Sequence, residues 1–294
     1  MKISDLDRVA IVGVGLLGGS IGHALRAAGF AGTRVGIGRR LSSLETALSC
    51  EAVDEITLDP EQGVRKAQVV ILCTPITRFE QMCRAMGPGL TAGTYVTDVG
   101  STKAGVVTMA RRVLPPKVRF VGSHPIAGSE RTGVEFARAD LFDRALCIVT
   151  PSPKTPPAHV RWIREFWEGI GANTITMEPR RHDKMLARVS HLPHAVATAL
   201  VNLSLRDGAI DVAGPGFADV TRVASGDPDM WTDILRTNRT AMLQSIDRLV
   251  AELNRLRDRL DHDDADALRD WLATGKQGRD EWIASRYRKK VLPP

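Results

Sequence analysis

Residues 8–25 read RVAIVGVGLLGGSIGHAL and decide the fold of the first part of the chain. The apolar, β-branched opening predicts a buried strand, and the end of the stretch predicts a helix. Between them three glycines have the spacing Gly13-x-Gly15-x-x-Gly18. Gly13 permits a tight turn, Gly15 lets the backbone approach a pyrophosphate, and Gly18 lets the helix pack close to the strand. The stretch therefore predicts a dinucleotide site with the phosphates at the helix N-terminus.

The end of the second strand bears on which dinucleotide binds. A site for NAD usually has an acidic residue about 20 positions after the glycines. Here Gly38 stands at that place and is followed by Arg39, Arg40 and Ser42. Their guanidinium and hydroxyl donors suit a 2′-phosphate, so NADP is favoured over NAD. The alternative is a solvated loop beside NAD. The turn residues that we expect to contact the cofactor are Gly13, Gly15, Leu16, Leu17 and Gly18.

Short apolar runs separated by helical segments predict an α/β fold with a Rossmann-type, doubly wound parallel sheet. The expected strands are 8–12, 34–37, 69–73, 95–98, 119–121 and 147–149. A proline-rich segment at 151–157 is interpreted as a loop within this domain, because a helix and a strand-like run follow it. We therefore expect a dinucleotide-binding domain at 1–178 and an all-helical substrate and dimerisation domain at 179–294.

The second domain is expected to hold three long helical segments, 180–205, 230–260 and 264–287. One of them carries an apolar stripe at helical spacing, which can bury one face against a neighbouring helix or a second subunit. We favour a homodimer, with an intramolecular core stripe as the alternative. The stripe consists of Met242, Ile246, Leu249, Leu253, Leu256 and Leu260.

Composition excludes several classes of protein. The chain has 294 residues, of which 43% are hydrophobic and 25% charged, as in an ordinary two-domain globular protein. Its longest strictly apolar runs are far shorter than the roughly 20 residues that span a bilayer, so no membrane partner is expected. The apolar start at 9–17 is broken by glycine and does not resemble a signal peptide. Four cysteines without metal-ligand spacing predict reduced thiols, no metal and a cytoplasmic location.

The basic balance does not indicate nucleic-acid binding. The formal net charge is +6, and residues 276–294 hold six Lys and Arg against two acidic residues, so four of the six charges lie in this tail. Only 5% of residues are aromatic, and no basic stripe is interleaved with stacking residues. The basic residues that we expect to matter are local ones beside the cofactor and the substrate.

Further polar residues stand where predicted strands end. Thr74 and Pro75 follow one apolar run, and Asp98 and Ser101 follow the next. Ligands gather beyond the carboxyl ends of parallel strands, so these turns should face the cofactor, although turn chemistry or a helix N-cap would explain them too. His124 follows the next strand and is restrained by a proline. A lone histidine of this kind is more often a structural residue, which stays the alternative. Together with Ser101 it has the character of a general base and an orienting hydroxyl.

Six stretches follow one another between Val12 and Trp231: VGVGLLGGSIG, LCTP, VTDVGSTK, VGSHPIAGSERTGVE, VSHLPHAVATAL and TRVASGDPDMW. In this order and combination they resemble the prephenate and arogenate dehydrogenase family of tyrosine biosynthesis. The resemblance covers most of the chain.

The resemblance implies roles for particular residues. His124 matches the histidine that accepts the proton of the substrate's ring hydroxyl, and Ser101 matches the serine that hydrogen-bonds both. Arg222 matches the arginine that holds a substrate carboxylate, a task suited to its bidentate fork. In this family hydride leaves the hydroxyl-bearing carbon for the nicotinamide, and loss of carbon dioxide makes the ring aromatic. Further positions that match the substrate pocket are Glu130, Ser190, His191, His194 and Trp231.

Two features leave the substrate open. Members often carry a basic residue four positions before the carboxylate-binding arginine, where this chain has Ala218. The missing acid at Gly38 resembles NADP-using members, many of which prefer arogenate, whereas His194 resembles members that use prephenate. We favour prephenate, with arogenate as the alternative substrate. Other readings are a different NADP reductase, such as an imine or β-hydroxyacid reductase, and a dinucleotide-sensing regulator.

Overall fold

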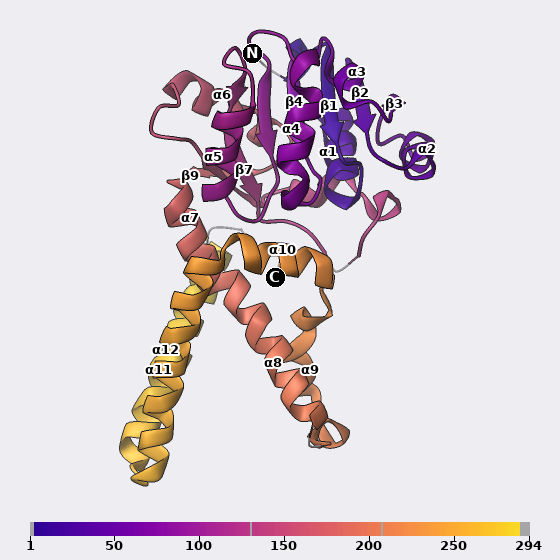
Figure 1. Cartoon of the computed structure of the whole chain (residues 1–294). Coiled ribbons are helices and arrows are strands. Elements are labelled where there is room, and N and C mark those ends of the chain that lie inside the picture. The colour runs from indigo at the N-terminus through magenta and orange to yellow at the C-terminus, as the bar shows by residue number, and fades with distance from the viewer. Residues whose placement is uncertain (1–2, 130, 207, 289–294) are drawn as a thin grey trace. The chain divides into compact units, whose positions relative to one another are not determined.

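A computed structural model describes residues 3–129, 131–206 and 208–288, so the predicted site residue Glu130 lies outside the described residues. By contacts the chain forms two compact units, one up to Asn238 and one from Arg239 onward. The first unit holds all the strands of the described chain and the helices up to α10 (Figure 1). The second is a pair of helices, α11 and α12.

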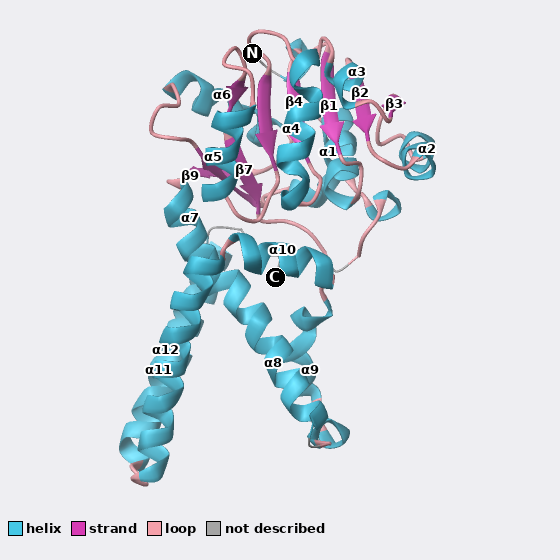
Figure 2. Cartoon of the chain, in the orientation of Figure 1, coloured by secondary structure: helices cyan, strands magenta, loops and turns pink. Residues whose placement is uncertain are grey.

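The first unit is built on a six-stranded, wholly parallel sheet (Figure 2). Its strand order is β3-β2-β1-β4-β5-β6, the arrangement of a dinucleotide-binding doubly wound sheet. This confirms the predicted fold class. The strands are β1 (Arg8–Val12), β2 (Thr33–Ile37), β3 (Glu55–Thr57), β4 (Val69–Leu72), β5 (Tyr95–Asp98) and β6 (Arg119–Phe120).

Helices cover both faces of this sheet because its central strands are apolar on both sides. Val9 and Ile11 of β1 join one buried cluster with α1 and α6, whereas Ala10 and Val12 join a second cluster with α4 and α5. Alternate side chains of a strand point to opposite faces, which explains this division. The helices of this part are α1 (Leu16–Ala27), α2 (Leu41–Ser49), α3 (Pro60–Val64), α4 (Phe79–Met86), α5 (Ala104–Val113) and α6 (Pro157–Gly169).

A second, three-stranded sheet corrects two predictions. The run expected at 147–149 belongs to this sheet and not to the parallel one. The sequence predicts a single strand at 119–121 with His124 beyond its end. In the structure β6 stops at Phe120, and the chain enters a separate strand, β7 (Gly122–Pro125), which pairs antiparallel with β8 (Leu146–Thr150). His124 thus lies within a strand, opposite Ile148. Parallel to β8 runs β9 (Asn173–Thr176).

The later helices differ from the three predicted segments in two places. The first segment is α7 (Pro179–Leu186), a π-helical turn (Ala187–His191) and α8 (Leu192–Arg206). The second segment is two helices, α10 (Pro228–Thr237) and α11 (Arg239–Asp261), because Asn238 has non-helical backbone angles between them. Between α8 and α10 lies α9 (Pro215–Thr221), and the last helix is α12 (Ala265–Arg288).

Short 3-10 helices connect several of these elements. They are Ile3–Asp5, Ile76–Arg78, Gly87–Gly89, Val134–Phe136, Ala139–Phe142, Ala209–Val212 and Arg222–Ser225. In the part of the chain that the structure describes, no helix is long and apolar enough to cross a membrane.

Candidate active site

The glycine turn after β1 has the geometry of a phosphate cradle. Gly13 has φ +97°, a backbone conformation that glycine adopts readily, and its N–H donates to the Ile37 carbonyl at 2.7 Å. A Cβ on Gly18 would clash with the Gly13 carbonyl oxygen, whereas open space surrounds the place where a Cβ on Gly15 would stand. Gly15 is the N-cap of α1 and makes no side-chain cap. The α1 N-terminus therefore fits a pyrophosphate.

The end of β2 presents basic side chains beside this cradle. Arg39 and Arg40 are exposed, and Ser42 is exposed on the first turn of α2. Arg40 is the N-cap of that helix, with no side-chain cap on the helix amides. At Gly38 a Cβ would press on Leu44. The end of β2 thus presents guanidinium and hydroxyl donors at a helix N-terminus, where negative charge is favoured.

The loops after β4 and β5 supply the other predicted cofactor residues. Thr74 is half-buried and Pro75 is exposed, directly after β4 and against the Gly13 turn. Asp98 ends β5 and is fully buried. Its carboxylate pairs with the buried Lys103 ammonium and also accepts from the Gly100 N–H at 2.9 Å. Asp98 thus holds the loop that leads to α5 in shape.

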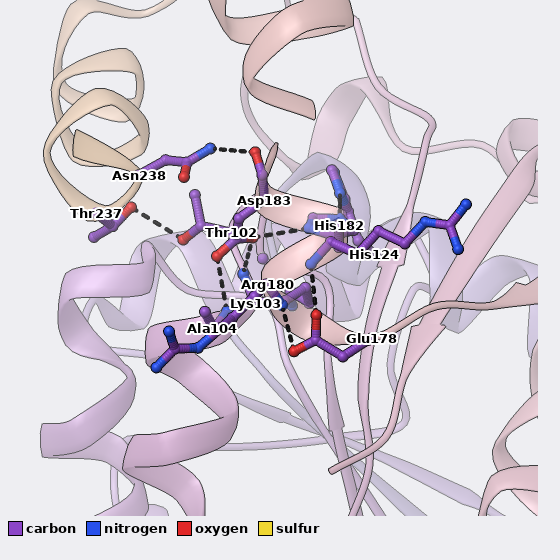
Figure 3. Close-up of polar contacts among 12 residues, drawn as sticks. Thr102, Lys103, Ala104, His124, Glu178, Arg180, His182, Asp183, Thr237 and Asn238 are labelled. Atoms are coloured by element: carbon purple, nitrogen blue, oxygen red, sulfur yellow. Dashed lines mark hydrogen bonds and ion pairs between the residues drawn. The ribbon is translucent and has the colours of Figure 1, made fainter. Parts of the chain in front are cut away.

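His124 is joined to a buried polar chain rather than to Ser101. Its Nδ1 lies 2.9 Å from Nε2 of His182, and Nδ1 of His182 lies 2.9 Å from Oδ1 of Asp183 (Figure 3). The side chain of His182 is fully buried. Ser101 is half-buried, and among the described residues the ring of His124 is hydrogen-bonded to His182 and not to Ser101. A histidine, a second histidine and a carboxylate therefore follow one another in a line.

Helix α7 supplies two members of this chain because its start is well defined. Pro179 occupies the first turn, and the Glu178 carboxylate accepts from the N–H groups of Arg180 and Arg181 at 3.0 and 2.7 Å (Figure 3). Proline at the first turn and a capping acceptor are typical helix starts. Residue 182 and its neighbour are thereby placed one turn into a fixed helix.

Asp183 also caps another helix. Its Oδ1 accepts from the Lys103 N–H at 2.7 Å, and its Oδ2 accepts from the Ala104 N–H at 2.9 Å. These are the first amides of α5, which has no side-chain cap of its own. The Asn238 amide donates to the Asp183 carbonyl at 2.8 Å. The carboxylate is thus held at a helix N-terminus, where negative charge is favoured.

The remaining predicted substrate residues gather around α8. The His194 ring stacks on Trp231 with centroids 3.6 Å apart, and His191 meets the same indole edge-on at 6.2 Å. A Cβ on Gly226 would collide with Trp231, so glycine is needed for this packing. His191 Nδ1 lies 3.1 Å from the amide nitrogen of Asn238. The structure thus brings together His191, His194 and Trp231.

Two predicted residues lie close in the chain to this group. Ser190 is half-buried within the π-helical turn that ends at His191. Arg222 begins the 3-10 helix that packs against α8, and it is exposed. The backbone of Val223, the next residue, hydrogen-bonds His194. Ala218 is exposed on α9.

Burial sets the charge of these histidines. Desolvation lowers the pKa of His124 well below its ordinary value, helped by the nearby His182, Lys103 and His191. Desolvation also lowers the pKa of His182, and it lowers that of His191 to about 4. Each ring is therefore neutral near pH 7. A neutral imidazole can accept a proton, as a general base must.

Two ring nitrogens in this group face no partner among the described residues. They are Nε2 of His191 and Nδ1 of His194, both buried. Asn238 donates to the other nitrogen of His191, so its Nε2 carries the hydrogen in the neutral ring. Buried polar groups are usually paired, so such atoms are natural points of contact for a polar ligand.

Sequence reasoning missed His182, Asp183, Lys103 and Asn238. The local sequence around the first two, PRRHDKML, is charged on all sides and gives no helical pattern that would predict burial. Sequence reasoning places a lysine such as Lys103 at the surface, since lysine is rarely buried unless it is paired. Its partner Asp98, five residues earlier at a strand end, is the one available signal.

A cavity of about 460 Å³ lies elsewhere in the first unit, along α5 and the start of α7. None of the predicted site residues lines it; its polar lining includes Arg111, Arg112 and Arg180. No group of three or more metal-ligating side chains is found within the described ranges.

Comparison with known proteins identifies the family of this chain. Residues 21–176 match the family model described as the nucleotide-binding domain of prephenate dehydrogenase, and residues 178–274 match its dimerization domain. The chain belongs to the prephenate dehydrogenase family. It is thus an oxidoreductase with a dinucleotide-binding domain.

The relatives cover nearly the whole chain. Prephenate dehydrogenase of Bacillus subtilis is 34% identical over 93% of this chain and 76% of its own length. Cyclohexadienyl dehydrogenase of Zymomonas mobilis is 32% identical over 92% of this chain and 94% of its own length. The crystal structure of prephenate dehydrogenase from Aquifex aeolicus, in complex with hydroxyphenyl propionate and NAD+, has a TM-score of 0.86 and 33% identity. The matched region covers 94% of this chain and 98% of the chain in that structure.

Proposed function

We propose that this enzyme oxidises and decarboxylates prephenate to 4-hydroxyphenylpyruvate, with His124 as the general base. The observation that carries the proposal is the buried His124 ring, joined by 2.9 Å contacts to His182 and Asp183 in the same compact unit as a glycine turn that fits a dinucleotide. Similarity to enzymes named for prephenate and cyclohexadienyl substrates supports it.

In this reaction His124 first accepts a proton and later returns it. The turn of Gly13, Gly15 and Gly18 would hold the dinucleotide, which would supply the acceptor for the hydride of the hydroxyl-bearing ring carbon. His124 takes the hydroxyl proton as that carbon becomes a carbonyl. The ring carboxylate then leaves as carbon dioxide, its bonding electron pair makes the ring aromatic, and the resulting phenolate oxygen takes the proton back. Prephenate and the oxidised dinucleotide thus give 4-hydroxyphenylpyruvate, carbon dioxide and the reduced dinucleotide, with no net proton released.

The direct test uses the purified chain with prephenate or arogenate and with NADP+ or NAD+. We expect growth of absorbance at 340 nm, fastest with prephenate and NADP+. Faster turnover of arogenate would replace prephenate as the substrate. No growth in any of the four combinations would refute the dehydrogenase proposal.

We infer that Arg222 holds a substrate carboxylate, with Ser190, His191, His194 and Trp231 around the ring and Glu130 as a further contact. Support comes from the exposed guanidinium on the 3-10 helix against α8, close in the chain to the ring-stacked histidine. Arg222→Ala should raise the KM for prephenate about tenfold or more, since charge-assisted pairs contribute roughly 1.5–3 kcal/mol. The matched control is Arg236→Ala, an exposed arginine of α10. Equal KM values in both variants would remove Arg222 from the pocket.

NADP is the proposed preferred cofactor. The basis is the exposed pair Arg39 and Arg40, with Ser42, around the α2 N-terminus in place of an acidic residue. Arg39→Asp combined with Arg40→Ala should lower the preference for NADP+ over NAD+ by at least about tenfold. Arg161→Ala, on the exposed side of α6, is the control. A cofactor preference unchanged by the double substitution would contradict this proposal.

We propose that two chains pair through the second compact unit. Leu253 and Leu260 of α11 are 52% and 60% exposed, and Leu272 of α12 is 62% exposed. Exposed apolar residues gathered on one helical hairpin mark an interaction surface, and the matched family model is described as a dimerization domain. Light scattering should give twice the 32.0 kDa of one chain. Leu253→Glu should shift that mass toward one chain.

We propose that the protein is located in the cytoplasm. All four cysteines are free, and burial raises the pKa of the Cys83 thiol to about 12. Such thiols suit a reducing compartment, where disulfides are rare. Cell fractionation with a cytoplasmic marker enzyme tests it, and co-purification with an external fraction would contradict it.

A further inference from the structure

The buried chain behind His124 has a consequence for its protonation. We propose that His182 and Asp183 are positioning residues that fix the neutral His124 ring in the tautomer whose Nε2 accepts the substrate proton. This rests on the proposed function for the identity of the reaction, but the tautomer itself follows from the hydrogen bonds. The chain runs through 2.9 Å contacts at both links (Figure 3).

The direction of the chain is set at its carboxylate end. A carboxylate can only accept hydrogen bonds, so Nδ1 of His182 must carry the hydrogen that lies toward Asp183. In a neutral His182 ring, Nε2 then has a free lone pair and must accept. The donor facing it is Nδ1 of His124. A neutral His124 ring that carries its hydrogen on Nδ1 has its lone pair on Nε2.

The carboxylate cannot easily turn away to reverse this order. Asp183 receives the Lys103 and Ala104 amides at 2.7 and 2.9 Å from the N-terminus of α5. Its own carbonyl receives the Asn238 amide at 2.8 Å. His182, between the two ends, has no exposed surface in its side chain. Fixing the tautomer in this way excludes, before the substrate binds, the His124 ring that carries its hydrogen on Nε2 and cannot accept a proton there.

The same chain suits a base that must return its proton. When His124 holds the hydroxyl proton, its positive charge lies in line with the Asp183 carboxylate, through one neutral ring. The other charged or titratable groups near His124 are Lys103, paired with Asp98, then His191, and the buried Cys147 thiol, which accepts from the His124 backbone. Burial and Lys103 oppose the charge, so the proton is held only weakly. A weakly held proton passes readily to the phenolate oxygen when carbon dioxide has left.

A matched pair of substitutions tests the proposal. Glutamine at 182 can place an amide oxygen where Nε2 of the imidazole stands, and so accept from His124. Asparagine reaches only as far as Nδ1, and so keeps a donor to Asp183 while leaving His124 without an acceptor. His182→Gln should retain kcat within about tenfold, whereas His182→Asn should lose at least about 100-fold, within the usual range for general-base catalysis. The KM for prephenate and the Kd for NADPH should change less than about threefold in both.

The opposite order would overturn the proposal. If His182 only fills space or supports the cap of α5, then His182→Asn, which keeps the bond to Asp183, should match or exceed His182→Gln. Equal loss of kcat in both variants would also overturn it. Melting temperatures of the two variants, measured alongside, report any general loss of folding.

A second measurement does not depend on turnover. In protein labelled with 15N-histidine, the ring signals of His124, assigned by their loss in His124→Asn, should show the hydrogen on Nδ1. The same signals should persist in His182→Gln and shift toward the Nε2-protonated tautomer in His182→Asn. A hydrogen on Nε2 in the unsubstituted protein would refute the proposal even if prephenate proves not to be the substrate.

Discussion

The glycine turn and the histidine chain are built in opposite ways. Gly13, Gly15 and Gly18 lie within six residues of one another, and they act through the backbone and the absence of side chains. His124, His182 and Asp183 come from two elements far apart in the chain, and they act through side-chain atoms. Both lie in the first compact unit. Cofactor binding and proton transfer should therefore fail separately when each is disturbed.

Lys103 joins the histidine chain to the end of β5. Its ammonium pairs with the buried Asp98 at the end of β5, while its backbone N–H donates to Asp183. A break here gives the largest expected loss of stability. Lys103→Met leaves a buried carboxylate without its cation, which costs about 3–5 kcal/mol in the free energy of unfolding.

Urea denaturation measures this loss. The control is Lys276→Met, which removes an exposed ion pair with Asp280 and should leave the unfolding midpoint unchanged. If both substitutions change the midpoint equally, the buried pair does not stabilise the junction between β5 and the histidine chain.

Acid should affect the region built from histidines more strongly than the glycine region, where, among the described residues, only His23 of α1 has a pKa lowered by burial. The pKa values of His124, His182, His191 and His194 are all lowered by burial in the folded chain. The unfolded chain therefore binds more protons below about pH 6.5, and stability falls as the pH drops from there toward 4. His191, with a pKa of about 4, should account for roughly 3 kcal/mol of that fall.

The measurement is the free energy of unfolding against pH. His191→Gln should flatten the curve below pH 6.5, whereas substitution of the exposed His262 by glutamine should not. An unchanged slope in His191→Gln would contradict the assigned burial effect.

The smallest expected change concerns the glycine region alone. A Cβ on Gly18 would press on the Gly13 carbonyl and deform the phosphate cradle. Gly18→Ala should weaken NADPH binding by about ten- to 100-fold, since overpacking typically costs 1–3 kcal/mol. Gly105→Ala, on α5 with nothing near its added Cβ, should bind as the unsubstituted protein does. Fluorescence titration of NADPH measures both, and equal affinities would show that the turn tolerates a side chain.

The sequence predicts the parts of the fold that rest on local pattern. The glycine spacing and the apolar runs predict the parallel sheet, because a buried strand between helices is apolar on both faces. The strand β3 escapes prediction, since Glu55–Thr57 is only three residues long and half exposed. The break at Asn238 escapes too, because the apolar period continues across it while its side chain bonds the distant Asp183.

The candidate site divides in the same way. His124 stands out in the sequence beside a proline and small residues. The stretch around it, VGSHPIAGSERTGVE, specifically resembles a motif of the family. The partner of His124, His182, does not stand out, because the pairing depends on how α7 meets β7 and α5, and no spacing in the sequence encodes that meeting. Ser101 is expected beside His124 only because both residues follow the ends of predicted strands. Hydrogen bonds between side chains that are distant in the sequence depend on the tertiary structure.

The most direct test of the division between the two regions is made on His124→Asn, with NADPH affinity and prephenate turnover measured on the same preparation. We predict that kcat falls at least about 100-fold, as expected when a general base is lost, while the Kd for NADPH changes less than about twofold. Turnover close to that of the unsubstituted enzyme, or loss of NADPH binding together with turnover, would contradict the account.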